Sequence, residues 1–234
     1  MITKNFVISI IVPVYDEEAT ISATLDALLK IKSNFSSMEI IVVDDGSQDK
    51  TSEKLKEFTS VNYMRHEINR GKGAAIKTGV KNAVGDIIVI QDADLEYDPS
   101  YIPYLVEPII SGKADAVYGS RFLGKLNGMS RSHHIGNAIL SRVMSILYNV
   151  KISDVMTGHK AFVREIFDSL DLEEKGFSVE IELTSKVLQG GWKLTEIPIS
   201  YSYRSHGKAK IRYLDGFKSF LKILSYKIRK NNST

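Results

Sequence analysis

One stretch of sequence decides the fold of this chain: GDIIVIQDADLEYD, residues 85–98. The apolar run Ile87–Ile90 is bounded by Gly85-Asp86 and by a polar cluster, which is typical of a fully buried, parallel strand. Side chains two positions apart on an extended backbone point the same way. Asp92 and Asp94 are therefore predicted to project together from the carboxyl end of this strand.

Two neighbouring carboxylates at a strand end call for a positive partner. At about 4 Å and an effective dielectric of about 20, two like charges repel by roughly 4 kcal/mol. Oxygen ligands favour Mg²⁺ or Mn²⁺, and these ions usually hold substrate phosphates as well. The alternative is a plain polar turn after a buried strand, and an isolated Asp-x-Asp does not exclude it.

The first half of the chain alternates strands and helices. Strands are expected at 8–14, 39–43, 61–65 and 86–91, and helices follow from Thr20, after Asp49 and over 74–83. This order predicts an α/β fold with a mostly parallel open sheet and helices on both faces. Ligands of such sheets bind beyond the carboxyl ends of the strands. Three polar clusters fall at that edge: Tyr15-Asp16-Glu17, Asp44-Asp45 and Asp92-Ala93-Asp94.

Several other classes are excluded by what the sequence lacks. Residues 71–76 miss the third glycine of the dinucleotide fingerprint, and no P-loop motif occurs. The pair His133-His134 has no cysteines or metalloprotease context, so it is interpreted as a surface pair. The chain has no cysteine, which rules out disulfides and thiolate chemistry. Residues 7–14 are too few for a signal peptide or a membrane span, and no other stretch reaches the ~20 apolar residues that a span needs.

The second half contains two apolar helical patterns and a basic tail. Residues 135–148 carry apolar side chains over about half of the circumference expected of a helix, so this helix is either buried or lies against something apolar. Pro198 confines a strand at 193–201 to an edge or a bulge. Residues 213–230 form a basic amphipathic pattern, which suits either an anionic membrane surface or packing on the sheet. From Tyr203 onward there are nine Lys/Arg and one acid, although the whole chain carries only +3.

An ordered set of motifs resembles family 2 glycosyltransferases of the GT-A fold, in particular the dolichyl-phosphate mannose and glucose synthases. The motifs are PVYDEE at 13–18, VVDDGS at 42–47, NRGKGAA at 69–75, GD at 85–86, DAD at 92–94 and GSR at 119–121. The likeness covers about residues 7–228. It implies a catalytic domain over 1–212 and a C-terminal amphipathic helix over 213–234 that could attach to a membrane.

The resemblance implies a residue set for a nucleotide-sugar donor, linked to UDP or GDP. Base and ribose would be held by Pro13, Tyr15, Glu17, Val43 and Asp45. Lys72 would lie in a loop that closes over the donor, and Ala93 would line the same site. The metal that bridges the diphosphate would be bound by Asp92, Asp94 and Glu96.

It also implies a catalytic set for the acceptor and the leaving group. Arg121 and Arg131 would face an acceptor phosphate. Arg204 and Lys210 would contact the donor diphosphate, with Asp94 beside them. An acceptor that is a polyprenyl or dolichyl phosphate is already ionised, so transfer with inversion would need no general base. The segment Asp154–Gly158 has the spacing of the glucose-type synthases, which favours a UDP-sugar.

Two alternatives remain open at this point. The same class of enzyme could act on a sugar hydroxyl of a polysaccharide or glycolipid, and Asp154 is then the candidate base. The chain could also bind a nucleotide-sugar without catalysis. The expected partners are the donor, a polyprenyl-phosphate lipid and the cytoplasmic face of a membrane, with no nucleic acid. Oligomeric state is not indicated by the sequence.

Overall fold

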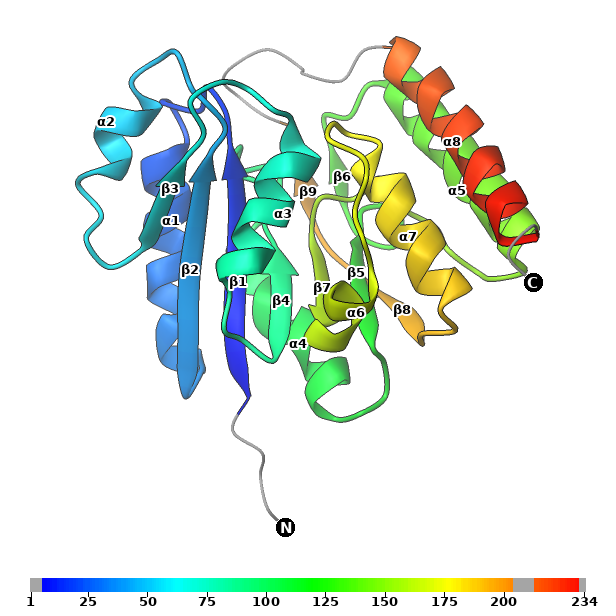
Figure 1. The fold of residues 1–234 in the computed structure, drawn as a ribbon, viewed down its shortest axis with the longest axis horizontal. Coiled ribbons are helices and arrows are strands. Elements are labelled where there is room, and N and C mark those ends of the chain that lie inside the picture. Colours follow the sequence, from blue (N-terminus) through cyan, green and yellow to red (C-terminus); the bar gives the residue numbers. More distant parts are fainter. Residues whose placement is uncertain (1–5, 204–212, 232–234) are drawn as a thin grey trace.

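A seven-stranded sheet forms the centre of the protein (Figure 1), whose computed structural model describes residues 6–203 and 213–231. Its order is β3-β2-β1-β4-β7-β5-β8. The strands are β1 (Val7–Val14), β2 (Ser37–Asp44), β3 (Asn62–Arg65), β4 (Ile87–Ile90), β5 (Ala116–Ser120), β7 (Lys160–Val163) and β8 (Leu194–Pro198). A separate two-stranded sheet pairs β6 (Leu126–Asn127) with β9 (Tyr201–Ser202).

The sheet is mostly parallel and open, as the sequence predicts. Strands β1, β2, β3 and β4 run in one direction, and β5 and β8 are parallel to each other. Only β7 runs against its two neighbours, β4 and β5. Because β5 is antiparallel to β7, it runs in the same direction as β4. The carboxyl ends of β1, β2, β4 and β5 therefore meet at one edge of the sheet.

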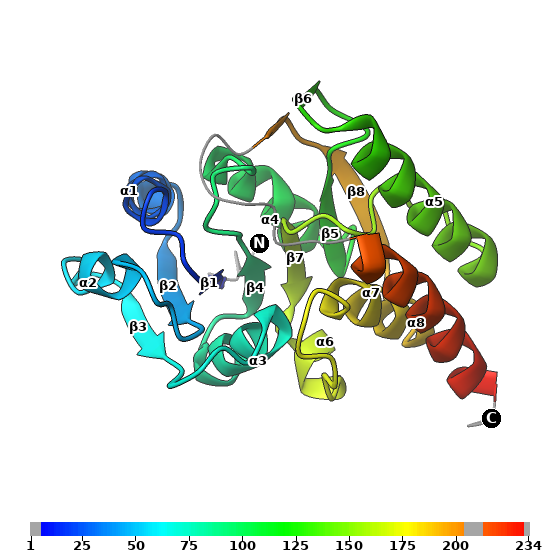
Figure 2. The same ribbon diagram turned by 90° about the horizontal axis from the view of Figure 1, so that it is seen from above.

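Helices cover both faces of the sheet (Figure 2). One face is covered by α1 (Ile21–Ile31), α2 (Thr51–Leu55) and α4 (Ile102–Ile110). The other face carries α3 (Lys72–Asn82), α6 (Arg164–Ser169) and α7 (Val179–Gln189). Two longer helices, α5 (Arg131–Tyr148) and α8 (Tyr213–Asn231), lie side by side at the β8 end of the molecule in both views. Short 3₁₀ turns occupy Lys32–Asn34 and Pro99–Tyr101.

Burial on both faces explains why β4 is an uninterrupted apolar run. Ile87 and Val89 pack among the side chains of α1 and α4, whereas Ile88 and Ile90 pack on the α3 and α7 side. All four are completely buried. Each such side chain stabilises the fold by about 1.5–3 kcal/mol through removal from water. An alternating strand would leave one face polar, so this pattern requires helices above and below.

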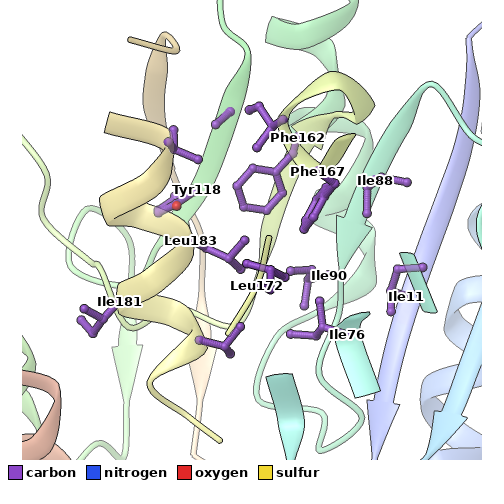
Figure 3. Packing of buried hydrophobic residues seen from close by; sticks show 14 of the residues in the cluster. Ile11, Ile76, Ile88, Ile90, Tyr118, Phe162, Phe167, Leu172, Ile181 and Leu183 are labelled. Carbon is purple, nitrogen blue, oxygen red and sulfur yellow. The ribbon is translucent and has the colours of Figure 1, made fainter. Parts of the chain in front are cut away.

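The core on the α7 side is built around aromatic rings (Figure 3). The Phe162 ring meets Tyr118 at 5.8 Å and Phe167 at 5.2 Å between centroids, both edge-on. Leu183 of α7 faces this cluster. Edge-to-face pairs of this kind add about 0.5–1.5 kcal/mol beyond their buried area. These ring contacts help to hold β7 and α6 against α7.

Three features of the second half differ from, or refine, the sequence interpretation. Strand β7 was not expected, because its four residues follow a glycine turn and lack a bounded apolar run. Helix α5 begins at Arg131, before the expected 135, because the Ser130 side chain accepts a hydrogen bond from the N–H of His133. The proline-containing strand β8 is at the edge of the sheet, as predicted.

Helix α8 packs on the body through α5 and α7. Its side chains Ser219, Ile223 and Tyr226 are buried, while other apolar positions on the helix stay exposed. The division into 1–212 and 213–234 stays a prediction. Within residues 6–203 and 213–231, no helix combines the length and apolar character needed to cross a bilayer.

Candidate active site

A cavity of about 550 Å³ opens at the edge where the strands β1, β2, β4 and β5 end. Most of the residues singled out from the sequence line it. On the side of β1, β2 and β4 these are Pro13, Tyr15, Glu17, Asp45, Lys72, Asp92, Ala93, Asp94 and Glu96. The other lining residues include Tyr97, Arg121, Met129, His133, Asn137, Met156, Phe177, Tyr201 and Tyr203. The parallel sheet thus gathers residues that are more than a hundred positions apart.

The loop after β1 is fixed to the loop after β2. Asp16 has a positive φ of 49°, a conformation that costs a non-glycine residue energy and is common at functional sites. The N–H of Asp16 donates to Ser47 Oγ at 3.0 Å, and the N–H of Glu17 donates to Thr51 Oγ1 at 2.9 Å. The Thr20 hydroxyl donates to Glu17 Oε2 at 3.0 Å. The first wall of the cavity is therefore a rigid double loop.

Asp45 is buried and accepts several hydrogen bonds. Its Oδ1 lies 2.6 Å from His66 Nδ1 and 2.9 Å from the N–H of Arg70, and its Oδ2 accepts the N–H of Gly71 at 2.6 Å. The second ring nitrogen of His66 contacts Thr78 Oγ1 at 2.9 Å. No sequence motif pointed to His66, which joins Asp45 to helix α3.

Asp92 and Asp94 leave β4 together, as predicted, and both line the cavity. A lysine ammonium rests on Asp92: Lys72 Nζ lies 2.7 Å from Oδ1 and 3.0 Å from Oδ2. Gly158 packs directly against this carboxylate, so that a Cβ there would lie 1.9 Å from Asp92 Oδ2. Burial raises the pKa of Asp92 to about 6; Lys72 opposes this shift, while the charges of Asp94 and Glu180 add to it.

Lys72 is shared with a second carboxylate that the sequence did not reveal. Its Nζ lies 2.9 Å from Glu180 Oε1, and Glu180 Oε2 pairs with Lys160. Burial would lower the pKa of Lys72, but Asp92 and Glu180 outweigh it and raise the pKa well above its ordinary value. Burial would raise the pKa of Glu180, yet Lys160 and Lys72 hold it below normal. Asp92, Lys72, Glu180 and Lys160 thus form a row of ion pairs in which negative and positive groups alternate.

The glycines around Lys72 bring it to this position. Gly71 has a φ of 96°, and a Cβ on it would lie 2.3 Å from the carbonyl oxygen of Lys175. A Cβ on Gly73 would lie 2.0 Å from the carbonyl oxygen of Glu174. The N–H of Gly73 donates to Lys175 O at 2.7 Å. The first turn of α3 can therefore dock on the segment before α7, which places Lys72 beside Glu180.

The carboxylates suit a divalent cation only in part. Asp92 and Asp94 offer oxygen ligands in the cavity wall, and the Lys72 ammonium shows that a cation is favoured against Asp92. Glu96 accepts a hydrogen bond from the Tyr201 hydroxyl instead, and among residues 6–203 and 213–231 no three acidic or histidine side chains converge as a metal cluster. Two carboxylates plus substrate phosphates are a normal ligand set for Mg²⁺. The residues therefore fit a metal that arrives with a diphosphate.

The other side of the cavity is organised by Arg121 and Asp154. Arg121 Nε and Nη2 donate to the two oxygens of Asp154, each at 2.7 Å, and the Arg121 N–H adds a third bond at 3.0 Å. Asp154 is completely buried, and its own N–H donates to Glu196 at 2.9 Å. A guanidinium has five N–H donors, so Asp154 leaves some of them available to a ligand. The carboxylate itself is enclosed.

Aromatic rings surround the guanidinium of Arg121. Its central carbon lies 5.9 Å from the Tyr97 ring, 5.8 Å from Phe122 and 5.6 Å from Tyr201. Cation–π contacts at this distance hold the plane of the side chain and keep water away from it. Arg121 is 5% exposed although it lines the cavity. This half of the cavity offers one fixed cation in an apolar wall, which suits an anion carried by an apolar or sugar-like group.

Other predicted residues lie elsewhere. Val43 is completely buried in the core on the α3 side and is not part of the cavity lining. Arg131 is exposed at the start of α5, whereas His133 and Asn137 line the cavity. Of the pair interpreted as surface residues, His134 is exposed and His133 is half-buried at the cavity. Arg204 and Lys210 lie outside the described residues. His133 and Asn137 are one helical turn apart, a signal that only the true start of α5 would have revealed.

His159 is a buried residue that no motif pointed to. It is completely buried, and neither ring nitrogen has a hydrogen-bond partner among the residues the structure describes. Burial lowers its pKa to about 3. Its ring lies 5.9 Å from that of Tyr97, whose hydroxyl accepts the N–H of Gly158 at 3.1 Å. The imidazole is therefore uncharged at neutral pH and packs behind the cavity wall.

Comparison with known proteins finds relatives that are similar over most of this chain. A protein of Methanocaldococcus jannaschii, described as uncharacterized, is 33% identical over 229 residues, covering 94% of this chain and 92% of that protein. A dolichol-phosphate mannosyltransferase of Pyrococcus furiosus is 30% identical over 213 residues, which cover 88% of this chain and 59% of that enzyme. The chain thus spans about three fifths of the length of that relative.

Solved structures share the fold. A glucosyl-3-phosphoglycerate synthase from Mycobacterium tuberculosis, in complex with Mn²⁺ and uridine-diphosphate-glucose, superimposes with a TM-score of 0.75 and 22% identity over 96% of this chain and 79% of that one. Residues 9–171 match the family described as Glycosyl transferase family 2. The ordered motifs, the GT-A sheet and these similarities lead to one conclusion: the chain is a member of glycosyl transferase family 2.

Proposed function

We propose that the chain transfers a hexose from a UDP- or GDP-linked sugar to a polyprenyl or dolichyl phosphate, with inversion and with Mg²⁺ or Mn²⁺. The observation that carries this proposal is the division of one cavity between acidic residues and a buried arginine. Asp92 and Asp94 follow β4 and Arg121 follows β5, and β7 separates these two strands. A donor diphosphate with its cation fits the first group, and an anionic acceptor fits the second.

The residues have distinct roles in such a transfer. The leaving nucleoside diphosphate gains negative charge, and fixed positive groups in a site that excludes water stabilise that charge strongly. Lys72 is within the cavity wall and can serve there, while Asp92 and Asp94 would hold the metal. When bound, the metal would supply Lewis-acid stabilisation of the diphosphate. Arg121 would position the acceptor phosphate against the sugar.

The acceptor is proposed to be a phosphate because Asp154, the base expected for a hydroxyl acceptor, is not accessible. Asp154, the candidate base, is enclosed and has both oxygens on Arg121. A phosphate monoester is largely ionised at neutral pH, since its second pKa is about 6, and it needs no base. The relative from Pyrococcus furiosus is named for dolichol phosphate, and one structural neighbour is bound to phosphoglyceric acid. Both names involve a phosphate-bearing compound.

The experiment is a two-stage assay of the purified chain. Stabilisation against heat by a panel of UDP- and GDP-sugars with Mn²⁺ identifies the donor. Sugar transfer is then compared between a short-chain polyprenyl phosphate, phosphoglyceric acid and free sugars, with and without chelator. Preference for the polyprenyl phosphate and loss of turnover with chelator are expected. Transfer only to free sugar hydroxyls would refute the acceptor, and tight donor binding without any turnover would indicate a non-catalytic binding protein.

We also propose peripheral attachment to the cytoplasmic face of a membrane through α5 and α8. Exposed apolar side chains follow one another along both helices: Ile135, Ile139 and Ile146 on α5, and Phe217, Leu221 and Ile228 on α8. Among the basic residues of α8, Lys222 and Arg229 already pair with Glu174 and Glu173. The apolar residues should therefore contribute more to attachment than the charges.

Vesicle co-sedimentation tests this attachment. Replacing Phe217 and Leu221 by serine should release the chain from anionic vesicles without loss of folding, because both side chains are largely exposed. Replacing Lys218 and Lys222 by glutamate should weaken binding less, and mainly at low salt. Unchanged sedimentation of both double variants would exclude α8 as the attachment site.

A further inference from the structure

Lys72 occupies the place where a cation would meet Asp92. Its ammonium contacts both oxygens of Asp92 and one oxygen of Glu180, within 3.0 Å in each case. The Lys72 side chain is 12% exposed, and that exposed part faces the cavity. A divalent cation on Asp92 would lie beside this ammonium, and the repulsion between the two positive charges disfavours keeping both contacts.

Glu180 is held in position from behind. Its second oxygen pairs with Lys160, which is completely buried and donates to the carbonyl oxygen of Val155 at 3.1 Å. Lys160 also lies 4.7 Å from the centre of the Tyr118 ring. Glu180 is therefore a fixed carboxylate, and the ammonium of Lys72 lies between Glu180 and Asp92.

We propose that Lys72 is a resident counter-ion of Asp92, positioned by Glu180, that gives up Asp92 to the divalent cation only when a diphosphate arrives to receive the ammonium. Glu180 and Lys160 act as positioning residues in this arrangement. The inference rests on the proposed function in one respect, namely that metal and diphosphate bind at this edge of the sheet.

The count of charges gives the expected order of events. The ion-paired group of Asp92, Lys72, Glu180 and Lys160 holds two negative and two positive charges. A divalent cation that binds Asp92 alone would leave this group with an excess of positive charge in a poorly solvated place, where unpaired charge is costly. The two negative charges of the donor diphosphate restore the balance. Metal and nucleotide should therefore bind with positive coupling, and by linkage each strengthens the other equally.

Substitutions change this balance in opposite directions. Lys72→Met removes a positive charge, so Mn²⁺ alone should bind about tenfold more tightly or better, and its enhancement by UDP or GDP should shrink by a similar factor. Glu180→Gln removes a negative charge and should weaken binding of Mn²⁺ alone. If Lys72 and Glu180 had only a structural role, both substitutions would weaken the binding of Mn²⁺. Lys77→Met is the matched control, because Lys77 lies on the same helix but pairs with the exposed Asp171.

The measurement is the free Mn²⁺ signal in electron paramagnetic resonance at pH 7.5, titrated with and without UDP or GDP. The thermal midpoint of each variant shows that it is folded. Affinity for Mn²⁺ alone that falls in the order Lys72→Met, wild type, Glu180→Gln supports the proposal. If Glu180→Gln does not fold, the direction of change in Lys72→Met decides by itself.

Two results would overturn the inference, and they have different consequences. If Lys72→Met binds Mn²⁺ no more tightly than the wild type, while the wild type transfers sugar in a Mn²⁺-dependent way, only the counter-ion role of Lys72 fails. If no protein binds Mn²⁺ with or without nucleotide, the metal dependence in the proposed function fails as well.

Discussion

A single methyl group at Gly158 should displace the carboxylate of Asp92. A Cβ at this position would lie 1.9 Å from Asp92 Oδ2 and 2.7 Å from its Cγ. Ordinary contacts begin at 3.4 Å, so the carboxylate must recede by about 1.5 Å. The backbone of Gly158 lies outside the left-handed region, so alanine brings no conformational strain of its own. The effect of Gly158→Ala should arise from this collision.

The expected loss follows from the size of the displacement. A misplacement of about 1 Å in a catalytic arrangement costs about 100-fold in rate, equivalent to about 2.7 kcal/mol. Gly158→Ala should therefore lower kcat/KM for the donor by about 100-fold. The ion pair between Lys72 and Asp92 is the main contact at risk, and its side chains are only 12% and 21% exposed. Weakening it should therefore also lower the free energy of unfolding, by less than the roughly 3–5 kcal/mol that removal of one partner of a buried pair costs.

The assay is turnover of the donor sugar with Mn²⁺, accompanied by urea unfolding. Gly136→Ala is the matched control, because Gly136 lies within α5 and a Cβ there meets nothing within 4 Å. That variant should keep its activity and gain up to about 1 kcal/mol of stability from helix propensity. The double variant Asp92→Ala with Gly158→Ala should be no worse than Asp92→Ala alone, since both changes act on one group.

Two results would refute the reasoning about Gly158. Full activity of Gly158→Ala would mean that the Asp92 carboxylate is not used where the structure places it. Additive losses in the double variant would mean that Gly158 acts through another group, of which the Tyr97 hydroxyl is the nearest candidate because it accepts the Gly158 N–H.

Two further substitutions test the buried groups behind the cavity. Asp154→Asn should destabilise the fold by about 3–5 kcal/mol, because it leaves the Arg121 guanidinium buried without its carboxylate; loss of transfer to hydroxyl acceptors with unchanged urea unfolding would instead identify Asp154 as a base. His159→Leu tests the neutral imidazole: the wild type binds fewer protons when folded than when unfolded between pH 6.5 and about 3, so its stability falls as the pH drops through that range. At pH 5.0 the wild type should have lost about 2 kcal/mol from this group, a loss that His159→Leu lacks, and equal changes between pH 7.5 and 5.0 in both proteins by urea unfolding would contradict this.

Elements with a local hydrophobic periodicity could be predicted from the amino-acid sequence. The uninterrupted run Ile87–Ile90 predicted a strand buried on both faces, and the polar clusters after β1, β2 and β4 predicted the edge where the cavity lies. These predictions succeed because parallel strands must share one carboxyl edge, whichever order they adopt. Asp45 and Asp92 were placed correctly at that edge for this reason, whereas Arg121 was indicated by the family resemblance and not by the strand pattern.

The pairing of charges in the cavity, by contrast, depends on three-dimensional packing. Glu180 and Lys160 lie in an ordinary helical pattern and in a short strand, and nothing in their spacing relates them to Lys72. Their contact depends on β7 inserting between β4 and β5, and on two glycines that let α3 approach the segment before α7. Such contacts form between residues that are far apart in the sequence, so local sequence patterns cannot predict them. For the same reason Val43, which was expected at the donor, turned out to face the core.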